Sequence, residues 1–163
     1  MKIGIPKEIY PGEKRVATTP EVAKQLIKLG FDIAIETGAG ENANLSDEMY
    51  SSVGVNVLKN AKEVWAKSDI ILKVRGPESG AGFKSGELEL LKENQVLISF
   101  LWPGQNPDLL KKLEKKKVTA LAMDMIPRIS RAQKMDALSS MANIAGYRAV
   151  VEAAQNFGRF FTG

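Results

Sequence analysis

Short, continuous apolar runs of strand length recur along the chain and alternate with segments that carry helix signals. Such runs are typical of strands covered on both faces. Strands that alternate with helices favour a parallel sheet with helices on both sides. The sequence therefore predicts an α/β fold with a doubly wound, largely parallel sheet, of the Rossmann-like or flavodoxin-like type. The runs that predict strands are 2–6, 31–36, 55–58, 69–74, 95–100 and 118–123.

Capping residues between these runs mark where helices begin. Thr19 suits the N-cap and Pro20 the first position of a helix that Gly30 ends. Asp136 is placed to cap a long last helix over 137–157. Further helix starts are predicted at Ser46, at Asn60 with Glu63 in capping-box spacing, and at Asn106 with Pro107.

The helix that begins after Asn106 ends in a lysine-rich run, 111–117, in a chain of net charge +4. One interpretation is a nucleic-acid-binding patch. The other is the solvated C-terminal end of a helix, where cations interact favourably with the helix dipole. No aromatic side chains are interleaved with these lysines, so we favour the helix end and predict no nucleic-acid partner.

The chain contains neither cysteine nor histidine. The absence of cysteine excludes disulfides. The absence of histidine removes the usual acid/base catalyst at neutral pH and the commonest metal ligand. Ser–His and Cys–His nucleophile systems and a classical zinc site are therefore excluded, and we predict no metal site. No apolar run has membrane-spanning length, so we expect no direct membrane insertion by this segment.

Ligands of parallel α/β sheets bind beyond the carboxyl ends of the strands, so the segments that follow the predicted strands are the places to search. One of them, 38–43, reads Gly-Ala-Gly-Glu-Asn-Ala and fits the G-x-G-x-x-G/A pattern of dinucleotide-binding loops. A helix would have to open directly after it, yet 44–48 reads as a loop and a new helix start. We therefore predict a turn that requires glycine. The segments are 7–18, 38–44, 73–77, 102–106 and 124–136.

The segment that follows the last predicted strand is unusually polar. Between Arg128 and Met135 it has no clean period, so we expect a loop. It is either a solvated loop in front of a capped helix or a polar clamp for phosphate, carbonyl, hydroxyl or amide groups. The helix behind it has a face of small residues, which suits burial against the sheet or a helix–helix seam, within the chain or across a dimer. These residues are at 142, 145, 146, 149 and 153.

Several segments resemble the proton-translocating NAD(P) transhydrogenase family, in the N-terminal region of its alpha subunit, which is a relative of alanine dehydrogenase. They cover essentially the whole chain. The last two are specific to the transhydrogenase branch, and the earlier ones are shared more loosely with alanine dehydrogenase. The segments are KIGIPKE, EKRVATTP, KLGF, ETGAG, ILKVRGP, LISFLWPGQNP and the stretch that begins AMDMIPRISRAQ and runs to Gly163.

The resemblance implies that 1–136 is the first α/β lobe of the NAD(H)-binding component. Residues 137–163 would then be a long helix that leads to a second lobe, which carries the dinucleotide fingerprint. The implied activity is hydride transfer from NADH to NADP+, coupled to proton translocation. The implied partners are an NADP(H)-binding component, a membrane component and a second copy in a homodimer. The implied location is the cytoplasmic face of the bacterial inner membrane, as a soluble peripheral portion.

In this family, the loop that matches 128–136 reaches the nicotinamide end of NAD(H). By that match, Arg128, Asp136 and Ser139 bind the cofactor by orienting the carboxamide and nearby groups. Gln133 also binds the cofactor, at the ribose near the transfer point, and is the residue given a catalytic role. Because the cofactor is shared with the second lobe, we expect the chain alone to bind NAD(H) very weakly and to be inactive.

Two rival functions are an alanine dehydrogenase-like amino-acid oxidoreductase lobe and a non-catalytic dimerisation or interaction module. Amino-acid oxidation needs a general acid/base, and the dehydrogenase motif carries a histidine where this chain has Trp102. Hydride exchange between two nicotinamides needs only orientation and exclusion of water, which a histidine-free chain can supply. Arg15 and Lys73 match dehydrogenase positions that bind the substrate carboxylate. We prefer a structural or general electrostatic role for both here, because buried Arg and Lys need partners.

Overall fold

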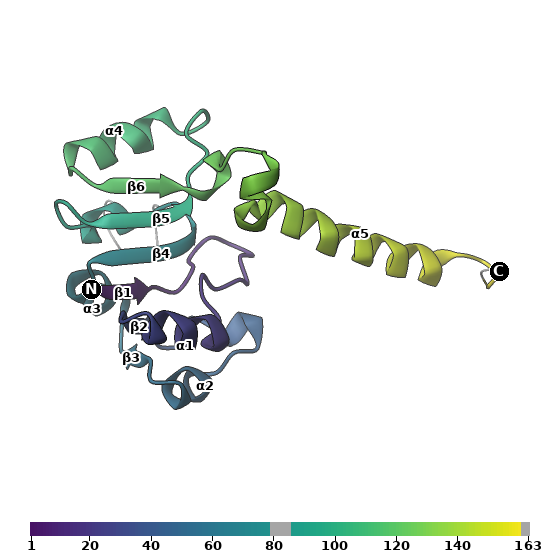
Figure 1. Cartoon of the computed structure of the whole chain (residues 1–163), viewed down its shortest axis with the longest axis horizontal. Coiled ribbons are helices and arrows are strands. Elements are labelled where there is room, and N and C mark those ends of the chain that lie inside the picture. Colours follow the sequence, from purple (N-terminus) through teal and green to yellow (C-terminus); the bar gives the residue numbers. More distant parts are fainter. Residues whose placement is uncertain (79–85, 161–163) are drawn as a thin grey trace. The chain divides into compact units, whose positions relative to one another are not determined.

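A sheet of six parallel strands, formed by residues between Lys2 and Ala122, is the centre of the fold in the computed structural model shown in Figure 1. Its strand order is β3-β2-β1-β4-β5-β6, and each neighbouring pair runs parallel. This confirms the predicted doubly wound α/β fold. The strands are β1 (Lys2–Ile5), β2 (Asp32–Glu36), β3 (Asn56–Leu58), β4 (Ile70–Arg75), β5 (Val96–Phe100) and β6 (Thr119–Ala122).

The structure describes residues 1–78 and 86–160. It separates into two compact units, Met1–Ala122 and a second unit that begins at Met123. This division after Ala122 reflects contacts within the chain and does not test the lobe boundary predicted between 136 and 137, which stays a prediction. Among the described residues, no helix is both long and apolar enough to cross a membrane.

The strand order creates a place for a ligand between β1 and β4. The chain proceeds outward from β1 through β2 to β3, then returns to pair β4 with the other side of β1. The connections after β1 and β4 therefore leave the sheet in opposite directions, and the carboxyl edge at such a point is where doubly wound sheets usually bind ligands. The segments 7–18 and 76–78 follow these two strands.

The helices of the first unit begin at the predicted caps. The Thr19 hydroxyl accepts a hydrogen bond from the Val22 amide at 3.4 Å, and the Asn60 side chain accepts one from the Glu63 amide at 3.0 Å. The Asn106 side chain makes no such cap, because its amide donates to the Leu101 carbonyl instead. The helices are α1 (Pro20–Lys28), α2 (Asp47–Ser52), α3 (Ala61–Lys67), α4 (Pro107–Lys115) and the short 3-10 helices η1 (Glu41–Ala43) and η2 (Gly86–Leu90).

Two apolar clusters hold these elements on the sheet. The first surrounds the buried Tyr50 ring and the isoleucines of β1 and β2. The second surrounds Trp65 on α3 with Leu97 and Leu113. The lysine-rich run lies where the sequence predicts, at the C-terminal end of α4. There Lys116 is the C-cap, and its ammonium donates to the Leu91 carbonyl at 2.9 Å.

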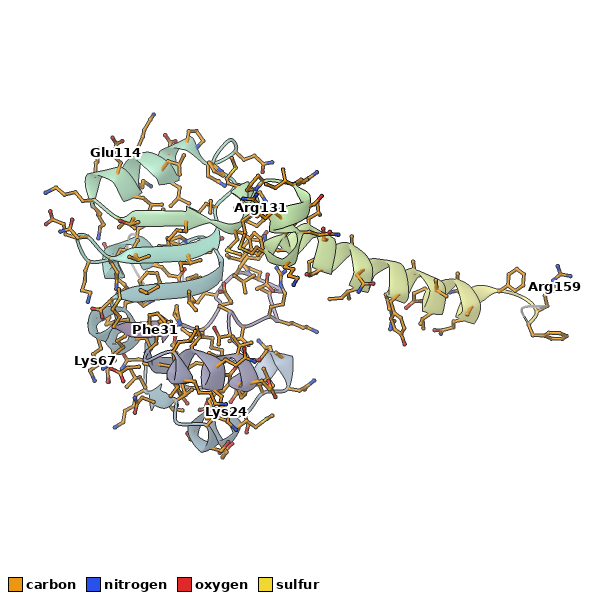
Figure 2. The ribbon with its side chains drawn as sticks, viewed as in Figure 1. Lys24, Phe31, Lys67, Glu114, Arg131 and Arg159 are labelled. Carbon is orange, nitrogen blue, oxygen red and sulfur yellow. The ribbon has the colours of Figure 1, made fainter. Side chains whose placement is uncertain are left out.

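The second unit contains a long helix, α5 (Ala137–Asn156), which confirms the predicted last helix to within one residue at its end. The segment predicted as a loop from Arg128 onward instead forms the 3-10 helix η4 (Ser130–Met135). Another 3-10 helix, η3 (Met123–Met125), begins at the residue predicted to end the last strand. No residue of α5 is buried, and side chains project from several sides of it in Figure 2. Burial of its small residues is therefore not found within the described residues. A helix–helix seam stays a prediction.

Gly4 on β1 provides a test of how closely α3 packs on the sheet. A Cβ at Gly4 would contact the Ser68 hydroxyl and lie 2.8 Å from Ser68 Cβ and 2.9 Å from Val64 Cγ1, two stiff side chains. We expect Gly4→Ala to lower the free energy of unfolding by about 1–3 kcal/mol through overpacking. Urea denaturation measures this. Gly104→Ala is the control, because no atom lies within 4 Å of its Cβ, and an equal loss in both variants would contradict the packing.

Candidate functional site

A shallow pocket of about 390 Å³ lies in the second unit, where η4 meets the first turn of α5. All four residues predicted to bind the cofactor line it, so the structure brings them together on one surface. The lining residues are Arg128, Ile129, Ser130, Gln133, Asp136, Leu138, Ser139 and Ala142.

The shape of this pocket follows from tight local turns. The Ile129 amide donates to the Pro127 carbonyl at 2.9 Å, and the Ala132 amide donates to the Ile129 carbonyl at 2.9 Å. Ala132 is the buried residue of η4, so its neighbours Arg131 and Gln133 are directed to the exposed side. Local backbone hydrogen bonds therefore fix the conformation of this polar segment.

Asp136 joins the pocket to α5. Its carboxylate accepts hydrogen bonds from the Leu138 amide at 3.0 Å and from the Ser139 hydroxyl at 2.8 Å. These bonds, the Ser139 hydroxyl foremost, lower the pKa of Asp136, and the Arg128 charge adds a smaller effect in the same direction. Asp136 is thus an ionised N-cap, as the sequence predicts, and it also faces the pocket.

Arg128 and Gln133 line this pocket and are exposed to solvent. Neither makes a side-chain hydrogen bond with any residue that the structure describes. The guanidinium offers several donors, and the glutamine amide offers both donors and an acceptor. With the Asp136 carboxylate and the Ser139 hydroxyl, the pocket presents the groups that hold an amide and a sugar hydroxyl. Within 1–78 and 86–160, no three Asp, Glu, His or Cys side chains are grouped to hold a metal ion.

A second polar cluster lies in the first unit, at the carboxyl edge between β1 and β4. Its centre is Lys73, whose side chain has no exposed surface. The Lys73 ammonium lies 2.7 Å from a Glu87 carboxylate oxygen and 3.4 Å from one of Glu8. Glu8 also accepts from the backbone amides of Val74 at 2.7 Å and Arg75 at 3.3 Å. Burial of Lys73 is thus compensated by two carboxylates.

Glu87 is the carboxylate of this cluster whose pKa is raised. Its side chain is 2% exposed, and it accepts from the Glu78 amide at 2.9 Å as well as from Lys73. Burial raises the pKa of Glu87, although the Lys73 charge acts in the opposite direction. Lys73 is shared with Glu8, so its charge does not fully offset the burial of either carboxylate.

Glu13 and two arginines complete the cluster at its outer side. Arg15 donates to Glu13 through Nε and Nη2, both at 2.7 Å, and Arg75 donates to Glu13 through Nε at 3.0 Å. Hydrogen bonds from Arg15 first, and from Arg75, lower the pKa of Glu13 to about 2. The Arg75 guanidinium also lies over the Tyr10 ring at 4.4 Å and the Trp102 ring at 5.3 Å.

Sequence reasoning identified only some members of this cluster. It singled out Arg15 and Lys73 and required partners for them, and the structure supplies carboxylate partners for both. It missed Arg75 and the carboxylates Glu8, Glu13 and Glu87. One signal was present, because Glu8 and Glu13 lie in the segment after the first strand. Nothing in the sequence marks Glu87.

The rejected glycine fingerprint forms a turn, as predicted. Gly38 has a φ of 69°, in the left-handed region that favours glycine. The Ala39 amide donates to the Glu36 carbonyl at 3.0 Å, and the short η1 follows. The next α-helix, α2, begins only at Asp47, so no long helix opens directly behind the glycines.

Comparison with known proteins places this geometry in context. The family model described as "Alanine dehydrogenase/PNT, N-terminal domain" matches residues 4–145. The NAD(P) transhydrogenase subunit alpha of Cereibacter sphaeroides is 60% identical over 163 residues, which is all of this chain and 30% of that protein. The NAD(P) transhydrogenase subunit alpha of Haemophilus influenzae is 51% identical over 163 residues, again all of this chain and 30% of that protein.

Solved structures agree with these relatives. The structure of transhydrogenase from Sinorhizobium meliloti superposes with a TM-score of 0.86 at 37% identity, and covers 98% of this chain and 44% of that one. A structure of L-alanine dehydrogenase superposes with a TM-score of 0.83 at 30% identity, over 95% of this chain and 40% of that one. The chain therefore spans less than half the length of each of these relatives and structures.

The Lys73 cluster predicts a large effect of removing its cation. Lys73→Met leaves two buried carboxylates without their shared partner, so we expect a loss of about 3–5 kcal/mol in the free energy of unfolding. The control is Lys67→Met, whose ion pair with Glu63 is exposed, and which should lose less than about 1 kcal/mol. Urea denaturation of both variants measures the difference. Similar losses would show that the buried cluster contributes no more than a surface pair.

The raised pKa of Glu87 predicts a pH dependence of stability. The folded state holds the Glu87 proton more tightly than the unfolded state, whose pKa is near 4.5. The wild type therefore loses stability as the pH rises from 4.5 through the raised pKa. Glu87→Gln cannot titrate and should lack this loss, whereas Glu89→Gln, on the exposed side of the same short helix, is the matched control. Denaturation at a series of pH values checks this, and identical profiles for wild type and Glu87→Gln would refute it.

Proposed function

We propose, from the premise that the chain belongs to the alanine dehydrogenase/PNT N-terminal domain family, that it acts in the NAD(H)-binding component of a proton-translocating NAD(P) transhydrogenase. The transhydrogenase branch is supported by the 60% and 51% identities over the whole chain, against 37% for an alanine dehydrogenase of Methanococcus maripaludis. In this proposal, residues 1–136 form the first lobe and 137–163 form the helix that leads to the second.

The observation that carries the proposal is the pocket of η4 and α5. Four of its five polar side chains suit the nicotinamide end of a dinucleotide. We assign Arg128, Asp136 and Ser139 to the carboxamide and nearby groups, and Gln133 to the ribose next to the reacting carbon. Asp136 and Ser139 hold each other in place, because the Ser139 hydroxyl donates a hydrogen bond to the Asp136 carboxylate. Arg128 and Gln133 supply the adjustable contacts.

The proposed reaction fits the chemistry of these residues. Hydride transfer from NADH to NADP+ moves no proton at the reacting carbons, so the site needs no group that titrates near neutral pH. It needs the two nicotinamide rings at about 3–3.5 Å, oriented and shielded from water. Neutral and permanently charged side chains that orient the carboxamide are sufficient for this.

The partners follow from the same proposal. NAD(H) would be shared between this pocket and a second lobe, and NADP(H) would be bound by a separate component. A membrane component would couple the reaction to proton movement, with this segment peripheral at the cytoplasmic face of the bacterial inner membrane. The NAD(H)-binding component would be a homodimer, and α5 with its exposed small-residue face is one surface available for it. The 163-residue chain alone would bind NAD(H) very weakly and would be inactive.

The alternative of an amino-acid oxidoreductase is favoured by the TM-score of 0.83 to L-alanine dehydrogenase. It is opposed by the state of the two cations that a substrate carboxylate would need. Lys73 is paired with Glu8 and Glu87, and Arg15 is paired with Glu13. Turnover of alanine, or of pyruvate with ammonia, by the complete protein would favour this alternative.

Substitutions in the pocket test the proposed function in the complete transhydrogenase. Gln133→Asn and Arg128→Ala alter side chains that are exposed and make no hydrogen bond to the described residues, so the fold should be retained. We expect each to slow hydride transfer by up to about 100-fold, because a shift of about 1 Å in the nicotinamide is costly. Stopped-flow absorbance of NADH oxidation measures the rate, and circular dichroism checks the fold.

Arg131→Ala is the matched control, because Arg131 lies on the same 3-10 helix but does not line the pocket. Its rate should equal that of the wild type. If Arg128→Ala and Gln133→Asn also transfer hydride at the wild-type rate, the pocket does not hold the nicotinamide. If they unfold, the segment serves only to support α5.

A further inference from the structure

A shallow groove of about 390 Å³ lies between η2 and α4 in the first unit. It shares no residue with the Lys73 cluster or with the η4–α5 pocket. Its two sides are tied together, because the Lys116 ammonium donates to the Leu91 carbonyl at 2.9 Å. Leu88 packs against the second apolar cluster, so the fold fixes the shape of the groove. The lining residues are Leu88, Glu89, Lys112, Lys115 and Lys116.

Three ammonium groups in this groove have no carboxylate partner among the described residues. Lys112, Lys115 and Lys116 are spaced i, i+3 and i+4, which places them on one face of the end of α4. The ammonium groups of Lys112 and Lys115 make no ion pair or hydrogen bond with a described residue, and that of Lys116 donates to a neutral carbonyl. Glu89 lines the same groove but forms no ion pair within 1–78 and 86–160. The groove thus concentrates positive charge.

The other lysines of the same run are in a different state. Lys111 lies 3.5 Å from an Asp108 carboxylate oxygen, and Lys117 lies 2.6 Å from one of Glu93. The helix dipole favours cations at this end of α4 in general, but it does not distinguish the lysines that line the groove from these two. Like charges at a spacing of three or four residues repel each other, and an anion placed between them removes that repulsion.

The chemistry of the lining favours phosphate over other anions. Lysine binds phosphate as a compact point charge, whereas the arginine fork is the group that matches a carboxylate, and no arginine lines the groove. No aromatic side chain lines it either, so it offers no ring on which a nucleic-acid base could stack. Three ammonium groups suit an anion that carries more than one charge on neighbouring oxygens.

We propose that this groove is a binding site for a phosphate-bearing anion, in which Lys112, Lys115 and Lys116 contact the phosphate oxygens. Such a group comes from a free diphosphate or from the headgroup of an anionic lipid. Glu89 repels the anion and lowers the affinity of the site. The inference uses no residue of the η4–α5 pocket and does not depend on the proposed function.

The experiment titrates the full chain with inorganic pyrophosphate in a calorimeter at low ionic strength, where exposed charges are least screened. Lys112→Gln with Lys115→Gln should weaken binding about tenfold, because each exposed charge pair contributes up to about fivefold. Glu89→Gln should strengthen it about twofold. The matched control is Lys111→Gln with Lys117→Gln, which removes the same net charge outside the groove and should bind within about twofold of the wild type. Circular dichroism checks the fold of each variant.

A second arm of the experiment separates the two sources of phosphate. The same variants are sedimented with vesicles of phosphatidylglycerol and, for comparison, of phosphatidylcholine. Binding to phosphatidylglycerol that only the groove variant loses identifies a lipid headgroup, and the same pattern with pyrophosphate identifies a free diphosphate. Equal losses in the groove variant and in the matched control would mean that net charge alone attracts the anion, and would overturn the proposal. The absence of binding in both arms would also overturn it.

Discussion

The Lys73 ammonium has no contact with solvent, and its attraction to two buried carboxylates ties three separate segments of the first unit together. Glu8 comes from the segment after β1, Lys73 lies on β4, and Glu87 lies on η2. An isolated charge at this depth would be prohibitively costly, so each of the three groups is tolerable only because the others are present. The Glu8 carboxylate also accepts from two amides of β4 and so connects the charge to the backbone of the sheet.

This constraint organises the carboxyl edge as a whole. Lys73 is paired with carboxylates of the chain itself, and so are Arg15 and Arg75, which both bind Glu13. The Arg75 guanidinium also packs on the rings of Tyr10 and Trp102. The formal charges of the three cations and three carboxylates at this edge therefore cancel. A chain with the strand order of a ligand-binding sheet can in this way use the position between β1 and β4 for stability, while the proposed cofactor contacts lie in another segment.

In the second unit, one residue both caps a helix and lines the pocket. Asp136 begins α5 by accepting the Leu138 amide, and the same carboxylate fixes the Ser139 hydroxyl at the edge of the pocket. The cap therefore positions the side chains proposed to hold the nicotinamide end of NAD(H). Arg128 and Gln133, which carry no such structural duty, remain exposed and able to adjust.

Local sequence was enough to predict the strands and most helix starts, because apolar runs and caps such as Thr19 and Asn60 act within a few residues. It also identified four of the five polar residues of the pocket, since a 3-10 helix and a helical turn bring neighbours in sequence together. It missed the 3-10 helix itself, because so short a helix leaves no lasting period. The strand order and the partners of Lys73 and Arg75 emerge only from the folded sheet. Glu8 meets the Val74 amide across 66 positions and Glu13 meets Arg75 across 62, and separations of that size follow from how the sheet is wound rather than from any local preference.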